Sequence, residues 1–230
     1  MTSLEAGAPR AVGGHWPGFF ISFEGVDGAG KTTQVAALGM ALRHDGHEVI
    51  AVREPGDTAL GELARSLLLA EYGGEPIDPW AEALVFIAAR AQLLRQVVLP
   101  ALERGAVVIA DRYVDSTLAY QGGGRGLDLD VLRRLHRDTC GDVWPDLTLL
   151  LDLPREAAET RQRASLLPFD RMESAPAGFH VAVLGAFRAL AAAEPQRIVT
   201  IAAGRPAVVV SQDIWAAVSE RLEELREELA

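Results

Sequence analysis

The sequence has little that would hold a chain together by covalent bonds or place it in a membrane. Of its 230 residues only Cys140 is a cysteine, so it can form neither an intramolecular disulfide nor a metal site of several cysteines. No run of about 18 or more uninterrupted apolar residues occurs, which argues against a membrane span. Scarce cysteine is typical of a reducing compartment, so we expect a cytoplasmic location.

Positive charge is also scarce. The chain has 22 Lys and Arg residues against 32 Asp and Glu residues, and its formal net charge is -10. A protein that coats nucleic acid needs a basic face for the phosphates, so we expect no nucleic-acid partner. A small phosphorylated ligand needs only a locally positive pocket and is not excluded. The hydrophobic fraction of 49% is ordinary for a globular protein and excludes a disordered chain.

Residues 1–18 lack the features of a targeting segment. They contain four glycines, two prolines and no long apolar core, unlike a signal or transit peptide. We expect a flexible extension over 1–18 and a single domain over 19–230, because no linker divides the remaining chain.

Short apolar runs alternate with segments of helical spacing. Nearly continuous apolar runs are typical of strands buried on both faces, and strands separated by helices indicate parallel pairing. The pattern predicts one α/β domain with a parallel sheet of about five strands between layers of helices. The expected strands are 19–24, 48–52, 106–110, 147–153 and 197–201, and the expected helices are 31–44, 58–70, 79–104, 128–139, 155–163, 178–193 and 212–228.

The most specific motif is a glycine-rich phosphate loop. Residues 25–32 match G-x-x-x-x-G-K-[ST] between an expected strand and an expected helix, which is the context the motif requires. Its backbone N–H groups and the helix N-terminus attract phosphate oxygens. Lys31 would reach the β- and γ-phosphates and the Thr32 hydroxyl would hold Mg²⁺. A plain connecting turn is the weaker interpretation. The loop predicts a fold of the P-loop NTPase type.

Charged residues follow two further strands. Asp111-Arg112 ends the strand 106–110, and Arg53-Glu54 follows the strand 48–52. Ligands of open α/β sheets bind beyond the carboxyl ends of the strands, where an acid can hold Mg²⁺ and an arginine can grip a phosphate. A surface ion pair or an exposed turn is the alternative for each, but the neighbouring phosphate loop favours a site.

Together these motifs resemble the thymidylate kinase family, over nearly the whole chain from about Phe20 to the C-terminal helix. A phosphate loop alone would identify only a superfamily, whereas further motifs in the right order are specific. The motifs are Phe23-Glu24-Gly25-x-Asp27-Gly28-x-Gly30-Lys31-Thr32-Thr33, Arg53-Glu54-Pro55-Gly56, Ala88-Ala89-Arg90-Ala91-Gln92, Asp111-Arg112-Tyr113 and Ser116-Thr117-x-Ala119-Tyr120-Gln121-Gly122.

The resemblance implies transfer of the γ-phosphoryl group of MgATP to dTMP, giving dTDP and ADP. Arg53 and Arg112 would hold the acceptor phosphate, and Phe86 would stack on thymine, although Phe86 also resembles ordinary helix core. Arg90 would bind the edge of the base, and Tyr120 would crowd the 2′ position of the sugar. The remaining implied acceptor residues are Glu54, Ser116, Thr117 and Gln121.

The resemblance also implies the donor site. ATP would bind to Gly25, Asp27, Gly28, Ala29, Gly30, Lys31, Thr32 and Thr33, and Mg²⁺ to Thr32, Asp27 and Asp111, directly or through water. A lid at about 155–175 would close over ATP. The catalytic residues would be Lys31, Asp27, Arg112 and the lid residues Arg161 and Arg163, with Arg171 as a third candidate from the lid.

Several positions depart from the family pattern. The lid lacks the usual glycines over 164–168, and Asp57, Leu184 and Ala202 replace a glycine, an arginine and an aspartate. These differences leave open a paralogue acting on a modified or 5-substituted pyrimidine deoxynucleotide, or a catalytically weak nucleotide-binding protein. Members of the family are typically homodimers, so the resemblance also implies a homodimer.

Overall fold

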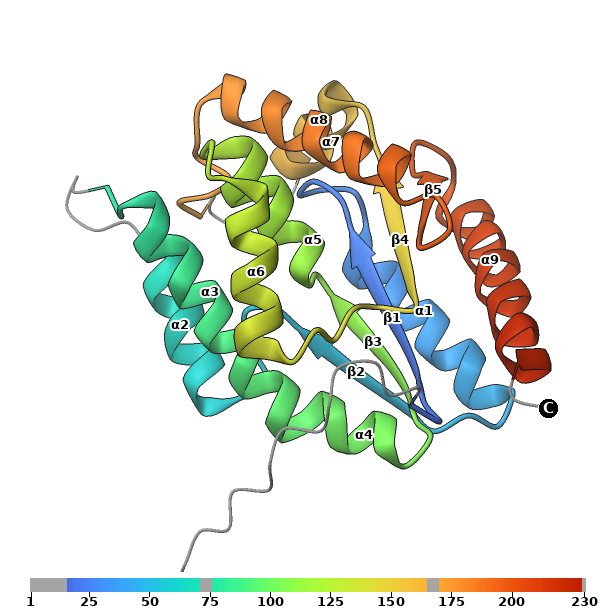
Figure 1. Cartoon of the computed structure of the whole chain (residues 1–230). Helices are drawn as coiled ribbons and strands as arrows, with labels where there is room; N and C mark the ends of the chain where they lie inside the picture. Colours follow the sequence, from blue (N-terminus) through green and yellow to red (C-terminus); the bar gives the residue numbers. More distant parts are fainter. Residues whose placement is uncertain (1–15, 71–75, 165–169, 229–230) are drawn as a thin grey trace, which may run out of the picture.

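The computed structural model describes residues 16–70, 76–164 and 170–228. A parallel five-stranded sheet of order β2-β3-β1-β4-β5 lies at its centre (Figure 1). Ile21 in the central strand pairs with Ile109 on one side and with Leu147 on the other. Each strand begins and ends within one residue of its prediction: β1 (Phe19–Glu24), β2 (Val49–Arg53), β3 (Val107–Asp111), β4 (Leu147–Asp152) and β5 (Ile198–Ala202).

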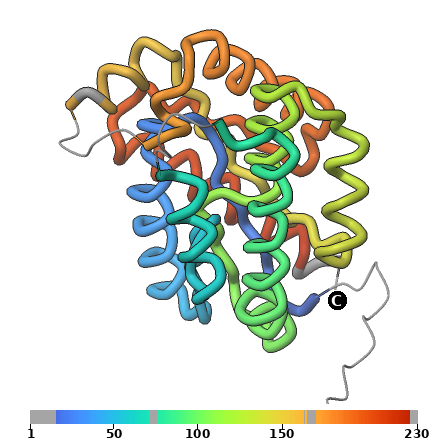
Figure 2. The backbone as a smooth tube through the Cα atoms, turned by 90° about the vertical axis from the view of Figure 1, so that its left-hand side faces the viewer, coloured from blue at the N-terminus to red at the C-terminus, as the bar shows by residue number. Residues whose placement is uncertain are grey.

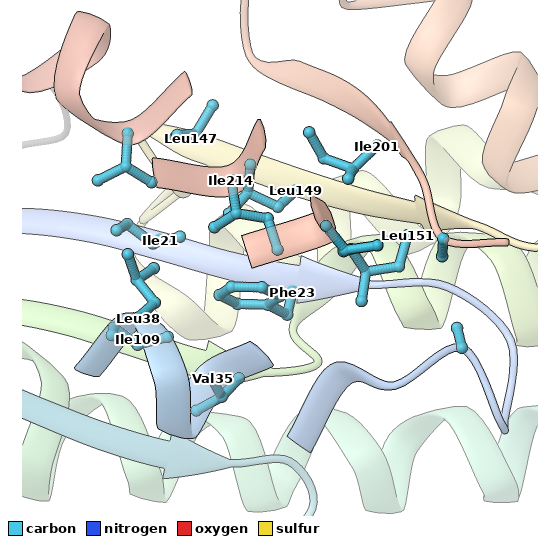
Figure 3. Close-up of a cluster of buried hydrophobic side chains, with 14 of the residues drawn as sticks. Ile21, Phe23, Val35, Leu38, Ile109, Leu147, Leu149, Leu151, Ile201 and Ile214 are labelled. Atoms are coloured by element: carbon cyan, nitrogen blue, oxygen red, sulfur yellow. The ribbon is translucent and has the colours of Figure 1, made fainter. Parts of the chain in front are cut away.

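One face of the sheet packs against three helices: α1 (Lys31–His44), α7 (Arg155–Ala164) and α9 (Ala207–Glu228). Alternate residues of each strand point to this face. Figure 3 shows Ile21 and Phe23 of β1 packed against Val35 and Leu38 of α1 and Ile214 of α9. These side chains are buried, and they fix the end of β1 against the start of α1.

The opposite face is covered by helices from the middle of the chain. Phe20, Val108 and Leu150 point to this side of the sheet. The covering elements are α3 (Pro79–Leu93), η1 (Leu94–Val98), α4 (Leu99–Glu103), α5 (Val114–Thr117), η2 (Leu118–Gly124), α6 (Leu129–Cys140) and α8 (Ala177–Ala193), and α2 (Ala59–Leu69) packs beside α3 (Figure 2). The predicted three-layer α/β fold is confirmed.

The stretch predicted as one helix over 79–104 is three consecutive helical segments. Pro100 has no N–H for the carbonyl of Gln96, and the chain passes this point in π-type geometry at 94–98. Pro79–Glu103 is long and apolar enough to cross a membrane, since an 18-residue window within it has a mean hydropathy of 1.4. Ile87, Leu93 and Leu102 in this stretch are buried in the protein core, which accounts for its apolar composition.

The prediction missed the helical turns of α5 and η2 at 114–124, which carry part of the site. The run of three glycines at 122–124 looks like a loop in the sequence. In the fold it allows close packing, because a Cβ on Gly123 would lie 2.4 Å from the Cβ of Ala186 in α8. The last helix also begins at Ala207, five residues before the predicted 212.

Residues 16–18, which precede β1, are in contact with the fold. Of the predicted extension 1–18, residues 1–15 lie outside the described part. The N–H of Gly18 donates to the carbonyl of Leu102 at 3.0 Å, and Trp16 packs against the core on the α3–α4 side. The carboxyl ends of β1, β2 and β3 meet at the opposite edge of the sheet, where the predicted site residues gather (Figure 1).

Candidate active site

The phosphate loop leaves the end of β1 and leads into α1. Gly25, Gly28 and Gly30 have φ angles of +132°, +81° and +94°, which suit glycine. Lys31 turns back into the loop and donates to the carbonyls of Gly25 at 3.1 Å and Val26 at 3.0 Å. Burial and the Arg112 guanidinium lower the pKa of Lys31 to about 8, although nearby carboxylates oppose them. Lys31 is also the only lysine of the chain.

An oxygen pair suited to a magnesium ion lies beside the loop. The Thr32 hydroxyl donates to Oδ2 of Asp111 at 2.7 Å, which joins the start of α1 to the end of β3. Thr32, Thr33 and Asp111 all border the open cavity above the phosphate loop, together with Gly28, Gly30 and Lys31. Ala29 is buried beneath the loop. Among the described residues no cluster of three or more His, Cys, Asp or Glu side chains could by itself hold a metal.

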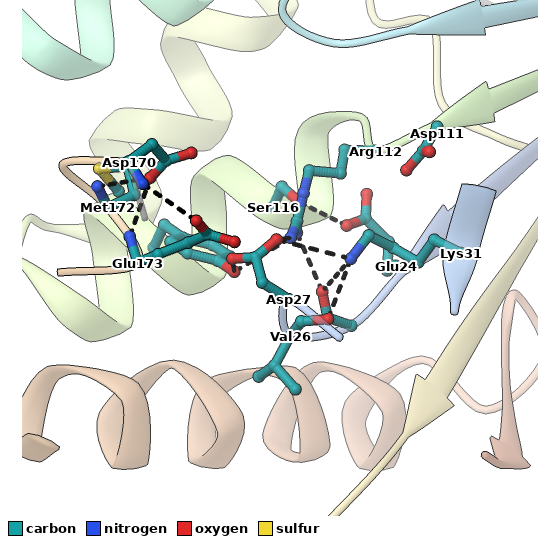
Figure 4. Close-up of polar contacts among 12 residues, drawn as sticks. Glu24, Val26, Asp27, Lys31, Asp111, Arg112, Ser116, Asp170, Met172 and Glu173 are labelled. Atoms are coloured by element: carbon teal, nitrogen blue, oxygen red, sulfur yellow. Dashed lines mark hydrogen bonds and ion pairs between the residues drawn. The ribbon is translucent and has the colours of Figure 1, made fainter. Parts of the chain in front are cut away.

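Arg112 connects the loop to the second half of the site. It donates to the carbonyl of Gly25 at 2.9 Å, to Oδ1 of Asp27 at 2.5 Å, to the Ser116 hydroxyl at 3.1 Å and to the Tyr120 hydroxyl at 3.2 Å (Figure 4). Burial alone would raise the pKa of Asp27, but the charges of Arg112 and Lys31 outweigh it and hold that pKa well below its usual range. Asp27 is therefore a carboxylate that lies between the cations Lys31 and Arg112. Asp27 and Asp111 lie on opposite sides of Lys31 (Figure 4).

A second pocket lies next to this cluster, between the end of β2, α2, α3 and η2. It brings together almost all the acceptor residues that the sequence predicted. Its lining includes Asp27, Glu54, Phe86, Arg90, Arg112, Ser116, Thr117, Tyr120 and Gln121. Phe86 is half-buried and borders the pocket, so it is not an ordinary core residue.

Arg90 is fixed at the bottom of this pocket, with 1% of its surface exposed. Its Nε donates to Oε2 of Glu54 at 2.8 Å, and its Nη2 donates to the Thr117 hydroxyl at 2.8 Å. Nη1 of Arg90 and Oε1 of Glu54 are buried without a hydrogen-bond partner. Burial raises the pKa of Glu54 to about 7, although Arg90 opposes it. A buried pair with one spare donor and one spare acceptor suits a polar planar ligand.

Arg53 does not reach this pocket. Its Nη2 donates to Oε1 of Glu62 at 2.9 Å, and its side chain borders the cavity above the phosphate loop. Because this ion pair is exposed, it offers little resistance to exchange for a phosphate.

Among the predicted lid arginines whose side chains the structure describes, Arg161 of α7 contacts the phosphate loop and Arg171 does not. Its guanidinium donates to the carbonyl of Gly28 at 3.4 Å and to the carbonyl of Ala203 at 3.0 Å. Arg171 points away from the loop and donates to Oε2 of Glu82 at 2.6 Å. The side chain of Arg163 lies outside the described residues, as does the segment 165–169 of the predicted lid.

The matches with known proteins agree with this geometry. The family model described as thymidylate kinase matches residues 23–214. A thymidylate kinase of Thermomicrobium roseum is 50% identical over 202 residues, which are 88% of this chain and 95% of that protein. One from Deinococcus radiodurans is 48% identical over 89% of this chain and 98% of that protein. The crystal structure of thymidylate kinase from Ehrlichia chaffeensis superposes with a TM-score of 0.71 at 30% identity, covering 87% of this chain and 98% of that one.

This chain belongs to the thymidylate kinase family. It is therefore a nucleoside monophosphate kinase that uses ATP as phosphoryl donor, and the family suggested by the sequence motifs is confirmed.

The three departures from the thymidylate kinase pattern have local structural roles. The Asp57 carboxylate accepts the backbone N–H of Arg53 at 2.5 Å, which orders the turn after β2. Leu184 packs against the core near α7 and borders a side cavity. The carbonyl of Ala202 accepts from Arg205 at 3.2 Å. The Ala202 contact uses its backbone carbonyl, and at Leu184 and Ala202 the chain lacks the charged side chain of the family pattern.

Sequence reasoning missed several residues of this thymidylate kinase site. Arg65 of α2 borders both cavities and donates to the carbonyl of Pro55 at 3.1 Å. Glu24 is fully buried and accepts from the Ser116 hydroxyl at 2.5 Å, and burial together with the Asp115 charge raises its pKa to about 7. Asp170 and Glu173 border the cavity above the loop. Glu24 directly precedes the phosphate loop, but nothing in the sequence indicates that Ser116 is its partner.

Proposed function

We propose that this protein transfers the γ-phosphoryl group of ATP to dTMP and produces dTDP and ADP. The observation that carries the proposal is the acceptor pocket, where the half-buried ring of Phe86 and the unpartnered Nη1 of buried Arg90 lie within one cavity. An aromatic face and a fixed guanidinium are suited to a planar base with carbonyl groups. Arg112, which borders the same cavity, is suited to the acceptor phosphate.

The reaction needs positioning and charge neutralisation more than covalent chemistry. ATP binds along the phosphate loop, and Lys31 exchanges its two carbonyl partners for the β- and γ-phosphates. Arg53 exchanges Glu62 for the acceptor phosphate, which Arg112 holds from the other side. Asp27 keeps Arg112 and the Tyr120 hydroxyl in place through bonds of 2.5 Å and 3.1 Å. The positive charge that the transferred group needs comes from Lys31 and the lid, where Arg161 is the first candidate and Arg163 the second.

Mg²⁺ is part of this proposal. The all-oxygen donor pair of Thr32 and Asp111 fits a magnesium ion, which keeps several waters and needs few protein ligands. When bound, the ion neutralises the charge of the phosphates. Asp27 lies next to Arg112 and Lys31, so in this proposal its contact with the ion runs through water.

In this proposal a lid that includes α7 and the residues from Asp170 completes the donor site, and the residues that precede the fold take no part in the chemistry. The described parts of the lid, α7 and the residues from Asp170, border the cavity above the phosphate loop. We also propose a cytoplasmic location, consistent with a single buried cysteine and with ATP as a substrate.

A homodimer is proposed through α2 and α3. Leu60, Leu63, Leu67 and Leu84 are all exposed on these adjacent helices, and Leu63 has 70% of its surface exposed. A cluster of exposed leucines of this kind marks an interaction surface. Light scattering should give about twice the mass of the 24.6 kDa chain, and Leu63→Glu should reduce it to one chain. A parent protein that scatters as a single chain at micromolar concentration contradicts the dimer.

The experiment that tests the activity is a coupled assay of ADP formation with ATP and Mg²⁺. The acceptors are dTMP, dUMP, UMP, dCMP and 5-hydroxymethyl-dUMP. We expect the highest kcat/KM with dTMP. A higher value with the 5-hydroxymethyl compound would favour the paralogue, and no turnover of any acceptor would favour a nucleotide-binding protein without activity.

A further inference from the structure

Glu82 of α3 is a fully buried carboxylate that four hydrogen bonds saturate. Its Oε1 accepts from Gln121 at 2.8 Å and from Nε of Arg125 at 3.1 Å. Its Oε2 accepts from Arg125 at 3.1 Å and from Arg171 at 2.6 Å. Burial by itself would raise the pKa of Glu82, but the bonds from Arg125, Gln121 and Arg171 lower it below its usual value. Glu82 is therefore ionised and fully partnered at neutral pH.

Gln121 and Arg171 lie in two different parts of the active site. Gln121 is in η2 and borders the acceptor pocket. Arg171 lies in the segment that precedes α8, 89 residues away from Glu82 along the chain. It is also tied to the end of α2, because its Nε donates to the carbonyl of Leu68 at 2.8 Å and its backbone N–H donates to the carbonyl of Leu69 at 3.2 Å. The Glu82 carboxylate thus joins the acceptor pocket to the segment of Arg171.

That segment, residues 170–173, borders both substrate sites. Asp170 and Met172 line the acceptor pocket, while Asp170 and Glu173 border the cavity above the phosphate loop. Figure 4 shows Asp170, Met172 and Glu173 grouped on the Asp27 side of the site, away from Lys31 and Asp111.

Hydrogen bonds also connect the residues of this segment with one another and with α7. Oδ1 of Asp170 accepts the backbone N–H groups of Met172 at 2.8 Å and of Glu173 at 2.9 Å. Oε2 of Glu173 accepts the N–H of Asp170 at 3.0 Å, and Gln162 of α7 donates to Oε1 of Glu173 at 3.3 Å. A change in the position of Arg171 therefore also moves Asp170 and Glu173, and through Gln162 it moves α7.

We propose that Glu82 and Arg171 are positioning residues that couple the acceptor site to the donor site. The inference rests on the proposed function, since it assigns dTMP to the first cavity and ATP to the second. A dTMP molecule that fixes Gln121 and Met172 also fixes Glu173 and α7 through the Glu82–Arg171 pair. ATP that binds afterwards then has to order less of Glu173 and α7, so its affinity rises. Because such coupling is reciprocal, each substrate raises the affinity for the other by the same factor.

The test is the affinity for dTMP, measured by calorimetry with and without a saturating non-hydrolysable ATP analogue, AMPPNP with Mg²⁺. The ratio of the two dissociation constants is the coupling factor. We expect at least about a fivefold factor in the parent enzyme, within the usual range for coupled sites. In Arg171→Met and in Glu82→Gln it should fall to below about twofold. Glu82→Gln retains the shape of the side chain and serves if Arg171→Met fails to fold.

A matched control separates coupling from loss of stability. Arg197→Met removes a comparable ion pair with buried Asp115, whose carboxylate accepts from Arg197 at 2.7 and 2.8 Å, outside both substrate cavities. It should lower Tm but leave the coupling factor unchanged. A coupling factor that persists in Arg171→Met and Glu82→Gln, or that Arg197→Met lowers equally, overturns the inference. If the parent enzyme binds no dTMP, the proposed function itself fails, which is a distinct result.

Discussion

The backbone of α7 lies against Gly28 so closely that a Cβ there would be 2.9 Å from the carbonyl oxygen of Ala158. Together with the φ of +81°, this contact leaves no room for a side chain at this position of the phosphate loop. Any cation for the transferred phosphoryl group besides Lys31 must therefore come from another element. Arg161, one turn beyond Ala158, donates to the carbonyl of Gly28 and is in place to supply it.

We expect Arg161→Ala to lower kcat by about 10³-fold, because an arginine that neutralises the transferred group acts mainly in the transition state. The affinity for dTMP should change little, since we propose that Arg53 and Arg112 hold its phosphate. Steady-state kinetics and calorimetry with dTMP test both expectations. Arg188→Ala, which removes an exposed arginine paired with Asp152, is the control.

The same measurements should include Arg163→Ala and the variant with both Arg161→Ala and Arg163→Ala, because the resemblance implies that both arginines are catalytic. If both single variants and the double variant keep near-normal kcat, the lid assignment is wrong. Arg171 would then be the residue to test, despite its bond to Glu82.

Tyr120 should exclude the ribose 2′-hydroxyl by the bulk of its ring. The ring packs against Phe179 and Phe187, with centroid distances of 6.0 and 6.1 Å, so its position is fixed. Tyr120→Phe should keep most of the preference for dTMP over its ribo counterpart, whereas Tyr120→Ala should reduce it by about tenfold or more. The measurement is the ratio of kcat/KM values for the two acceptors, well below the Tm of each variant. Equal use of both acceptors by the parent enzyme contradicts the assignment.

Asp111→Asn should weaken the binding of the magnesium ion that the reaction requires. The carboxylate that accepts from Thr32 loses its charge, and such a change costs roughly 10- to 100-fold in metal affinity. The Mg²⁺ concentration for half-maximal rate should rise accordingly at fixed ATP. Asp45→Asn, at an exposed position beyond the far end of α1, is the control. An unchanged Mg²⁺ dependence in Asp111→Asn would remove Asp111 from the metal site.

Glu54 should make the stability of the protein depend on pH. Burial raises its pKa to about 7, so between about pH 4.5 and 7 the native carboxyl keeps a proton that the unfolded chain has released. Its contribution to the free energy of unfolding is present below pH 4.5 and is lost as the pH rises through 7. In that window the free energy of unfolding falls by at most about 1.4 kcal/mol per pH unit. His136 acts in the opposite direction, because burial lowers its pKa to about 4.

The test is therefore the difference between Glu54→Gln and the parent protein, measured by urea unfolding at several pH values. Since His136 and Glu24 are the same in both, their effects cancel. The free energy of unfolding of the variant relative to the parent should rise steadily from pH 4.5 to 7. A difference that stays constant across this window would show that Glu54 is ionised in the native state throughout.

The sequence predicted those parts of the site that depend on local motifs and on strand order. Gly25 to Thr32 follow β1 directly, and Arg53 and Asp111 are the last residues of β2 and β3. Parallel strands bring their carboxyl ends to one edge of the sheet. Their proximity therefore follows from the fold class. The pattern of apolar runs was sufficient for the three central strands because β1, β3 and β4 are buried almost throughout. The edge strands β2 and β5 are only partly buried, but their apolar and β-branched residues gave the same signal.

The sequence did not predict residues whose role depends on partners far away along the chain. Glu82 looks like an acid in the first turn of a helix, and only the fold brings Arg171 to it. Arg65 looks like an exposed helix residue, and its place between two cavities depends on how α2 packs. The helical turns at 114–124 were missed because their glycines, read locally, indicate a loop, whereas close contact with α8 stabilises the helix there.

The most direct measurement is the transfer of label from ATP that carries ³²P at its γ-phosphate. Incubation of the parent protein with labelled ATP, Mg²⁺ and dTMP should place the label in dTDP, with one ADP formed for each. Lys31→Ala, which removes the only lysine of the chain, should abolish nearly all of that transfer. Absence of labelled dTDP with the parent protein, or equal transfer by Lys31→Ala, would contradict the account.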